Sequence, residues 1–75
     1  MADYCVILVH STSHAIQAER VLKRAGMAVK LIPTPRHLSS DCGSALRIKD
    51  ADQTAGEKLL TDAGVSIERI EPLPS

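Results

Sequence analysis

Two segments of the chain repeat the same order of residue types, and this repeat most constrains the fold. Residues 25–33 (AGMAVKLIP) and residues 63–72 (AGVSIERIEP) each run from a helix end through a glycine into a strand that stops at a proline. A glycine directly after a helical pattern is typical of a helix C-terminus. The chain therefore divides into two similar halves, each of which places a strand after a helix.

The first half predicts a strand, a helix and a second strand. Residues 4–9 (YCVILV) form a continuous apolar run of strand length, which is typical of a central strand. Hydroxyl side chains at residues 11–13 are suited to capping a helix. That helix is expected over residues 14–25, and the next strand over residues 27–32. The apolar residues at helical spacing are Ala15, Ala18, Val21, Leu22 and Ala25.

The second half predicts a strand, a helix and a last strand over residues 65–70. Residues 44–49 alternate, with Leu46 and Ile48 on one face of the strand and Arg47 on the other. The helix is expected to start at residue 50 or 52, and Gly56 weakens it by roughly 1 kcal/mol relative to alanine. Its apolar residues are Ala55, Leu59, Leu60 and Ala63.

This order of elements, strand–helix–strand twice over, predicts the α+β ferredoxin-like βαββαβ fold. The fold is a four-stranded antiparallel sheet with two helices on one face. Right-handed crossovers place the first and third strands in the centre of the sheet. A chain of 75 residues supports one such domain, residues 1–75.

Composition excludes several classes of function. Aromatic residues make up 1% of the chain, whereas an RNA-recognition sheet needs aromatic side chains to stack on bases. Nine basic and nine acidic residues cancel, so neither nucleic acid nor a membrane is expected as a partner. No apolar run has the length of a membrane span, and Asp3 interrupts the N-terminus before any signal-like stretch. Two cysteines are too few for a disulfide scaffold, so a cytoplasmic location with reduced thiols is expected.

The segment between the two halves, residues 33–43 (PTPRHLSSDCG), carries the candidate site. It is long for a connection between paired strands, which usually has two to five residues. Cys42 is the candidate nucleophile, because Arg36, His37 and a helix N-terminus lower a thiol pKa from its usual value of about 8.5, whereas Asp41 opposes them. Gly43 lets the backbone approach the sulfur closely. Donors for a bound anion or a terminal sulfur are Ser39, Ser40, Thr12 and Ser13.

The predicted topology brings this loop to the start of the first helix. The first two strands run in the same direction, so residues 10–13 are expected near Cys42. Cys5 belongs to the opposite end of the first strand, on the order of 15 Å away at about 3.3 Å per residue, which is too far for a disulfide. We therefore expect Cys5 to be a core residue and Cys42 to act as a single thiol.

Other interpretations of the same residues stay open. The loop is compatible with a proline-stiffened surface connection in which Arg36 only pairs with Asp41. His10, His14 and His37 could bind zinc together with the thiol, but their spacing is not that of a compact ligand motif, and no metal site is assigned. A Ser-His-Asp hydrolase finds its residue types in the loop without a defined triad geometry.

The motif PTPR followed by SSxCG, between Pro33 and Gly43, is the most specific of several features that together cover nearly the whole chain. The others are the apolar first strand, the alanine–glycine pair before the second strand, and a pattern at the first helix made by Ser11, Thr12, Ala15, Ala18 and Glu19. In these features the chain resembles the selenium/sulfur carrier-like family of small bacterial proteins. His10 departs from the family, where an apolar or aromatic residue is expected.

The resemblance implies that Cys42 is the carrier position, which holds sulfur or selenium as a persulfide or perselenide. It makes Arg36, Ser39, Ser40 and Gly43 the motif neighbours of this thiol. It implies a carrier rather than a stand-alone enzyme, with no cofactor, loaded by a donor protein and unloaded by an acceptor protein.

The alternative to a carrier is a non-catalytic regulatory module that binds a small anion or a partner at residues 33–43 and the first helix. The helix-free sheet face, expected to be open and largely aliphatic, is compatible with a homodimer. If a partner covers this face, Arg47 is the expected contact.

Overall fold

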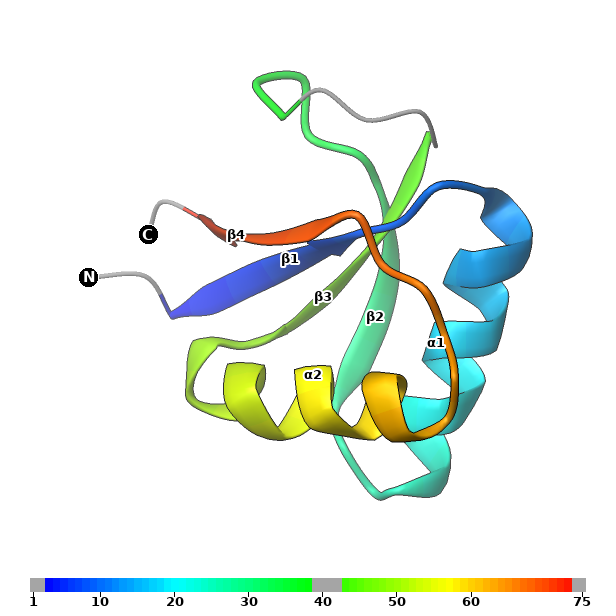
Figure 1. Ribbon diagram of the computed structural model, residues 1–75. Coiled ribbons are helices and arrows are strands. Elements are labelled where there is room, and N and C mark those ends of the chain that lie inside the picture. The colour runs from blue at the N-terminus through cyan, green and yellow to red at the C-terminus, as the bar shows by residue number, and fades with distance from the viewer. Residues whose placement is uncertain (1–2, 39–42, 74–75) are drawn as a thin grey trace.

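The computed structural model describes residues 3–38 and 43–73, and it contains the six expected elements in the expected order (Figure 1). A short 3₁₀ turn precedes the second helix. The elements are β1 (Tyr4–Leu8), α1 (Thr12–Arg24), β2 (Val29–Pro33), β3 (Ser44–Lys49), the turn η1 (Asp50–Asp52), α2 (Gln53–Asp62) and β4 (Arg69–Leu73).

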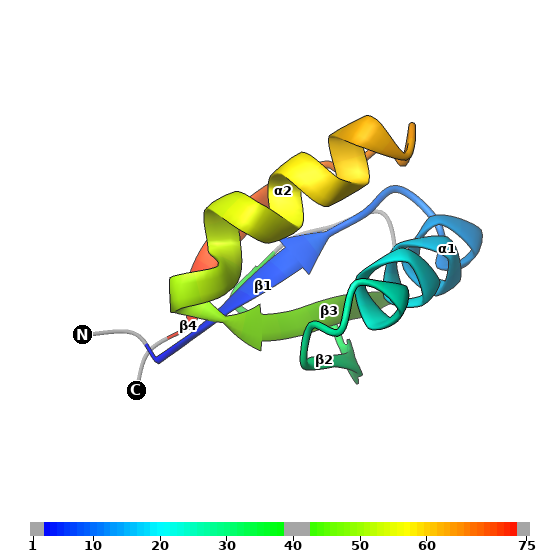
Figure 2. The same ribbon diagram turned by 90° about the horizontal axis from the view of Figure 1, so that it is seen from below.

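The four strands form one antiparallel sheet in the order β2-β3-β1-β4, with β1 and β3 in the centre as predicted. Ile7 in the middle of β1 pairs with Leu46 of β3 on one side and with Ile70 of β4 on the other. Both helices lie on one face of this sheet (Figure 2). The ferredoxin-like α+β prediction is therefore confirmed.

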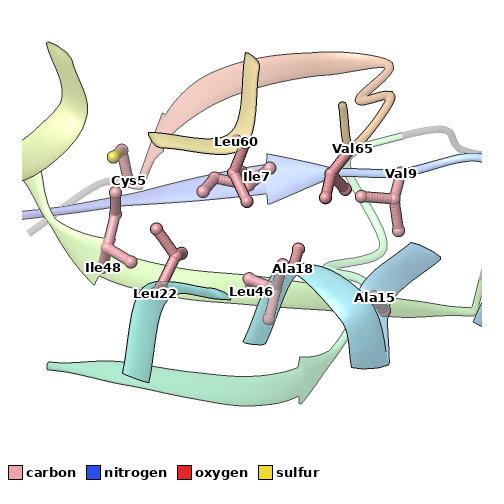
Figure 3. Packing of buried hydrophobic residues seen from close by; sticks show 10 residues of the cluster. All are labelled: Cys5, Ile7, Val9, Ala15, Ala18, Leu22, Leu46, Ile48, Leu60 and Val65. Atoms are coloured by element: carbon pink, nitrogen blue, oxygen red, sulfur yellow. The ribbon is translucent and has the colours of Figure 1, made fainter. Parts of the chain in front are cut away.

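The main core lies between the sheet and the two helices (Figure 3). It is aliphatic apart from one thiol, as the near absence of aromatic residues requires. Its buried members are Cys5, Ile7, Val9, Ala15, Ala18, Leu22, Leu46, Ile48, Leu60 and Val65.

A second, smaller core lies on the helix-free face of the sheet. Val6, Leu8 and Ala45 are fully buried there, and Leu38 from the loop packs against them. Ile32 also contacts this cluster. β1 is thus buried on both faces, which explains its continuous apolar sequence. The three residues of the cluster are covered within one chain, whereas the aliphatic residues packed against them are only half-buried. The homodimer through this face stays a prediction.

The ends of α1 follow local capping chemistry. Ser11 is the N-cap, so the helix starts at Thr12, earlier than predicted. At the other end Ala25 is an exposed cap residue and not the core residue we expected. Gly26 follows with φ of +81° and Gly64 follows α2 with φ of +75°, a left-handed backbone that favours glycine after a helix.

The packing of α2 corrects the sequence interpretation of this helix. Ala55 and Ala63, expected in the core, are exposed, whereas Gly56 is buried beside Leu60 on the inner face. A Cβ built at Gly56 would lie 3.0 Å from Cδ1 of Ile48. The glycine therefore allows α2 to approach the sheet closely, in addition to weakening the helix.

The last strand starts later than its predicted range of 65–70. Val65 is buried but only leads toward the sheet, and pairing begins where the amide of Glu68 donates to the carbonyl of Leu8. Pro72 lies inside β4 and not beyond it. Because β4 is an edge strand, a residue without an N–H is tolerated there.

Candidate functional site

The loop between β2 and β3 is closed at its base by the backbone. Pro33 and Ser44 form the last pair of the two strands, and the amide of Thr34 donates to the carbonyl of Gly43 over 3.0 Å. Further along, the amide of Leu38 donates to the carbonyl of Pro35, also over 3.0 Å, which closes a tight turn. The loop is therefore an excursion with a fixed base.

Leu38 anchors the first part of this excursion against the helix-free side of the sheet, where it packs on Val6, Leu8 and Ala45. The turn that precedes it carries Arg36 and His37, and both side chains are exposed. Arg36 and His37, both named from the sequence, are thus presented to solvent where the loop leaves the end of β2. This arrangement suits a site that receives an external ligand or protein.

The start of α1 and the base of the loop lie at the same end of the strands of the sheet (Figure 1). This follows from the pairing, because β1 and β2 are both antiparallel to β3 and therefore run in the same direction. Ser11 Oγ accepts a hydrogen bond from the His14 amide over 3.3 Å and lies 3.0 Å from His14 Nδ1. Thr12 and Ser13 are exposed in the first turn, which holds no acidic residue. The positive end of the helix dipole is therefore not neutralised by its own first turn.

Part of the predicted site lies outside the described residues. This applies to Ser39, Ser40, Asp41 and Cys42. The expected proximity of residues 10–13 to the thiol consequently stays a prediction, while the shared edge of the loop base and the helix start is observed.

Gly43 at the base of the loop is exposed, and a Cβ built there would meet no described atom within 4 Å. Its φ is not positive, since the positive-φ glycines of the described chain are Gly26 and Gly64. The described surroundings therefore do not require a glycine at this position. The close approach to the sulfur that the sequence suggested involves Cys42, which the structure does not describe.

Cys5 is a core thiol, as the sequence predicted. It is fully buried against Ile48 and its neighbours on the helix side of the sheet (Figure 3). Burial raises the pKa of Cys5 to about 11, and the charges of Asp50 and Asp52 add to the increase. A thiol in this environment is neither accessible nor ionised near neutral pH.

The described residues do not assemble a metal centre or a membrane-spanning helix. Within residues 3–38 and 43–73, no three His, Cys, Asp or Glu side chains gather closely enough to hold a metal ion. His14, one of the candidate zinc ligands, lies beside the N-cap serine. None of the helices that the structure describes is long and apolar enough to cross a membrane.

Sequence reasoning missed a second polar site, at the opposite end of the sheet. There the guanidinium carbon of Arg47 lies 4.4 Å from the centre of the Tyr4 ring, and both residues line a pocket together with Lys30 and Lys49. The sequence signal that could have found this site was the alternation of apolar and basic residues along β3, which places Arg47 and Lys49 on one face of the sheet. The contribution of Lys30 depends on the register between β2 and β3.

Comparison with known proteins identifies one family. The sequence model described as "Putative Se/S carrier protein-like" matches residues 4–72, which is nearly the whole chain. The chain has no significant match among curated proteins or among solved structures. The match extends from the first residue of β1 into β4 and includes the complete loop between β2 and β3.

Proposed function

Because the chain belongs to the Se/S carrier-like family, we propose that it carries one sulfur or selenium atom on Cys42, as a persulfide or perselenide. The observation that carries this proposal is the state of the other thiol. The chain has two cysteines, and Cys5 is fully buried with its pKa raised to about 11. At pH 7 about one Cys5 side chain in ten thousand is a thiolate, the reactive form. The state of Cys5 therefore supports Cys42 as the carrier thiol.

The described part of the loop supports this role through its charges. Arg36 and His37 are exposed in the turn that follows β2, and α1 begins at the same edge of the sheet without an acidic residue in its first turn. Cations and a helix N-terminus favour a thiolate and also favour the negative charge of a terminal sulfur or selenium. Thr12 and Ser13 are the exposed hydroxyls on the helix side of this edge.

Loading requires a donor protein that holds a persulfide. The Cys42 thiolate attacks the terminal sulfur of the donor, the sulfur–sulfur bond of the donor breaks, and the donor cysteine leaves as a thiolate. The terminal sulfur is now bound to Cys42 and keeps its oxidation state, so no oxidant or reductant is consumed. Unloading repeats the step with an acceptor thiolate, and selenium follows the same sequence. A reducing compartment such as the cytoplasm keeps the unloaded thiol available.

Transfer from a cysteine desulfurase supplied with cysteine tests the proposal by intact-protein mass spectrometry. The wild-type protein and Cys5→Ala should each gain the mass of one sulfur atom, and a thiol reductant should remove it. Cys42→Ser should gain nothing. Alanine is the proper replacement at position 5, because a serine hydroxyl would be buried among aliphatic side chains. Loading of Cys42→Ser together with loss of loading in Cys5→Ala would show that the proposed assignment is wrong.

A further inference from the structure

A pocket of about 180 Å³ lies at the end of the sheet opposite the loop between β2 and β3. It is formed by the start of β1, the start of β2 and the end of β3. From Ser44 at the loop base to Lys49 at the pocket, β3 extends on the order of 16 Å at about 3.3 Å per residue. The pocket therefore lies at the far end of β3 from the base of the loop. Its lining residues are Tyr4, Ala28, Val29, Lys30, Arg47, Ile48 and Lys49.

Three of the lining residues are cations on the helix-free face. Lys30 lies directly opposite Arg47 across β2 and β3, and Lys49 follows Arg47 on the same face of β3. Like charges directly opposite each other destabilise a sheet. None of the lining residues is acidic, and in the described part of the chain no carboxylate forms an ion pair with these three cations. An anion in the pocket would relieve this repulsion.

The acidic group that the register brings nearest on this face is already engaged. Glu71 of β4 lies across Val6, whose other neighbour is Arg47. Glu71 Oε1 accepts a hydrogen bond from Arg69 Nε over 3.1 Å. Arg69 also pairs with Glu68, so the two carboxylates share one cation. The positive charge of the pocket rests on its own three cations, which lie on strands at least two positions from β4 in the sheet, although the whole chain is neutral.

Tyr4 holds the guanidinium of Arg47 in place. The guanidinium carbon lies 4.4 Å from the ring centre, within the distance at which a cation and an aromatic face attract each other. Arg47 is half-buried, whereas Lys30 and Lys49 are exposed and free to adjust. A guanidinium stacked on a ring still presents its N–H groups at its edge, in the fork that matches two oxygen atoms of an anion.

We propose that this pocket binds the phosphate group of a small molecule. The arginine fork can engage two phosphate oxygens while each lysine contacts a further one. A phosphate ester carries a charge of about −1.5 to −2 near pH 7 on three free oxygens, so it matches three cations better than a carboxylate with one charge and two oxygens. The volume of about 180 Å³ is ample for a phosphate group, and the pocket opens to solvent, so a substituent on the phosphate can extend out of it.

Titrations of the full chain followed by amide chemical shifts test this site, with inorganic phosphate and glycerol phosphate as probes and sodium chloride at equal ionic strength as the control. We expect saturable shifts at residues 28–30 and 47–49, and none at residues 34–38. Arg47→Met should weaken binding by about tenfold or more, the effect of losing charged hydrogen bonds. The matched charge loss Lys58→Met, at an exposed position on α2, should change the affinity less than about twofold.

The affinities for inorganic phosphate and glycerol phosphate are compared to learn whether the pocket prefers the free ion or a phosphomonoester. Saturable binding of either probe supports the site. Should Arg47→Met fail to fold, Lys49→Met carries the same prediction, with a loss of about threefold or more. The inference is overturned by shifts that do not saturate, by equal shifts in chloride, by an unaltered affinity in both variants, or by tighter binding of acetate. Cys42→Ser should bind phosphate normally, so this test is independent of the carrier proposal.

Discussion

The close packing of α2 on the sheet depends on one glycine, and replacing it gives a sharp test of the fold. In Gly56→Ala the new Cβ would lie 3.0 Å from Ile48 Cδ1 and 3.5 Å from Met27 Sδ. Carbon atoms in favourable contact are about 3.5–4.0 Å apart. Ile48 is almost fully buried in the main core, so its methyl group has little room to move. The contact must be relieved by shifting α2 or by repacking Ile48.

Two opposing effects decide the sign of the change in stability. Alanine improves helix propensity over glycine by roughly 1 kcal/mol. Overpacking a core typically costs about 1–3 kcal/mol. Gly56→Ala should therefore lower the free energy of unfolding by about 1 kcal/mol. The same substitution at an exposed glycine in a helix should raise it.

Ile48→Val removes the Cδ1 atom that the new Cβ would meet, so it isolates the cause. Alone, this substitution should cost about 1 kcal/mol, as expected for a lost core methyl group. In its presence Gly56→Ala should become stabilising by roughly 1 kcal/mol, because only the helix-propensity gain remains. The coupling between the two positions should thus be about 2 kcal/mol.

Urea denaturation of the four chains, followed by far-UV circular dichroism, measures this cycle. Ala55→Gly, on the exposed face of α2, measures the effect of helix propensity alone in the same helix and should lower the free energy of unfolding by roughly 1 kcal/mol. The reasoning is refuted if Gly56→Ala stabilises the wild-type chain, or if its effect is the same with isoleucine and valine at position 48.

Three further predictions concern the core thiol and the loop. Because the fold raises the pKa of Cys5 from 9.0 to about 11, the folded chain retains a proton that the unfolded chain releases, so stability should fall by roughly 2 kcal/mol from pH 9 to 11. An equal fall in Cys5→Ala, measured by urea unfolding, would contradict this. Leu38→Ala should cost about 1–2 kcal/mol by the same assay, because the side chain covers the second core, whereas Leu31→Ala at an exposed position should cost less. Gly43→Ala should alter the thermal midpoint little, corresponding to within about 0.5 kcal/mol, and a large loss would reveal a contact at the loop base.

The order of elements could be predicted because each one carries a local signal. The continuous apolar run from residue 4 indicated a strand covered on both sides, and Val6 and Ile7 are indeed buried on opposite faces. Gly26 and Gly64 marked the helix ends through their left-handed backbone. These features need no knowledge of distant contacts, so sequence was sufficient.

Features that depend on tertiary pairing could not be predicted in the same way. The β-branched residues after Gly64 favoured an early strand, but β1 pairs only with the segment from Arg69 onward. Gly56 lies four residues before Leu60 and therefore on its face of the helix, but the close approach of α2 to Ile48 at this position depends on tertiary packing. The anchoring of the loop by Leu38 likewise depends on a fold-specific contact with the helix-free face.

The functional residues also fall into two groups, those that local sequence signals predict and those whose position depends on tertiary pairing. Burial of Cys5 follows from its place in an apolar strand and was predicted. The cationic pocket joins Lys30, Arg47 and Tyr4 from three strands, and their meeting depends on strand order and register. The sequence identified Arg47 as the contact on this face but not the group of cations around it.

The most direct test of a single-thiol carrier lets both cysteines of the wild-type protein compete for one donor. After sulfur transfer from a cysteine desulfurase and blocking of free thiols, trypsin separates the two sites, because Cys42 falls in the peptide of residues 37–47 and Cys5 in residues 1–20. Mass spectrometry of these peptides should find the transferred sulfur on Cys42 alone, with Cys5 unmodified. Sulfur on Cys5, or on neither peptide from a fully loaded donor, would contradict the account.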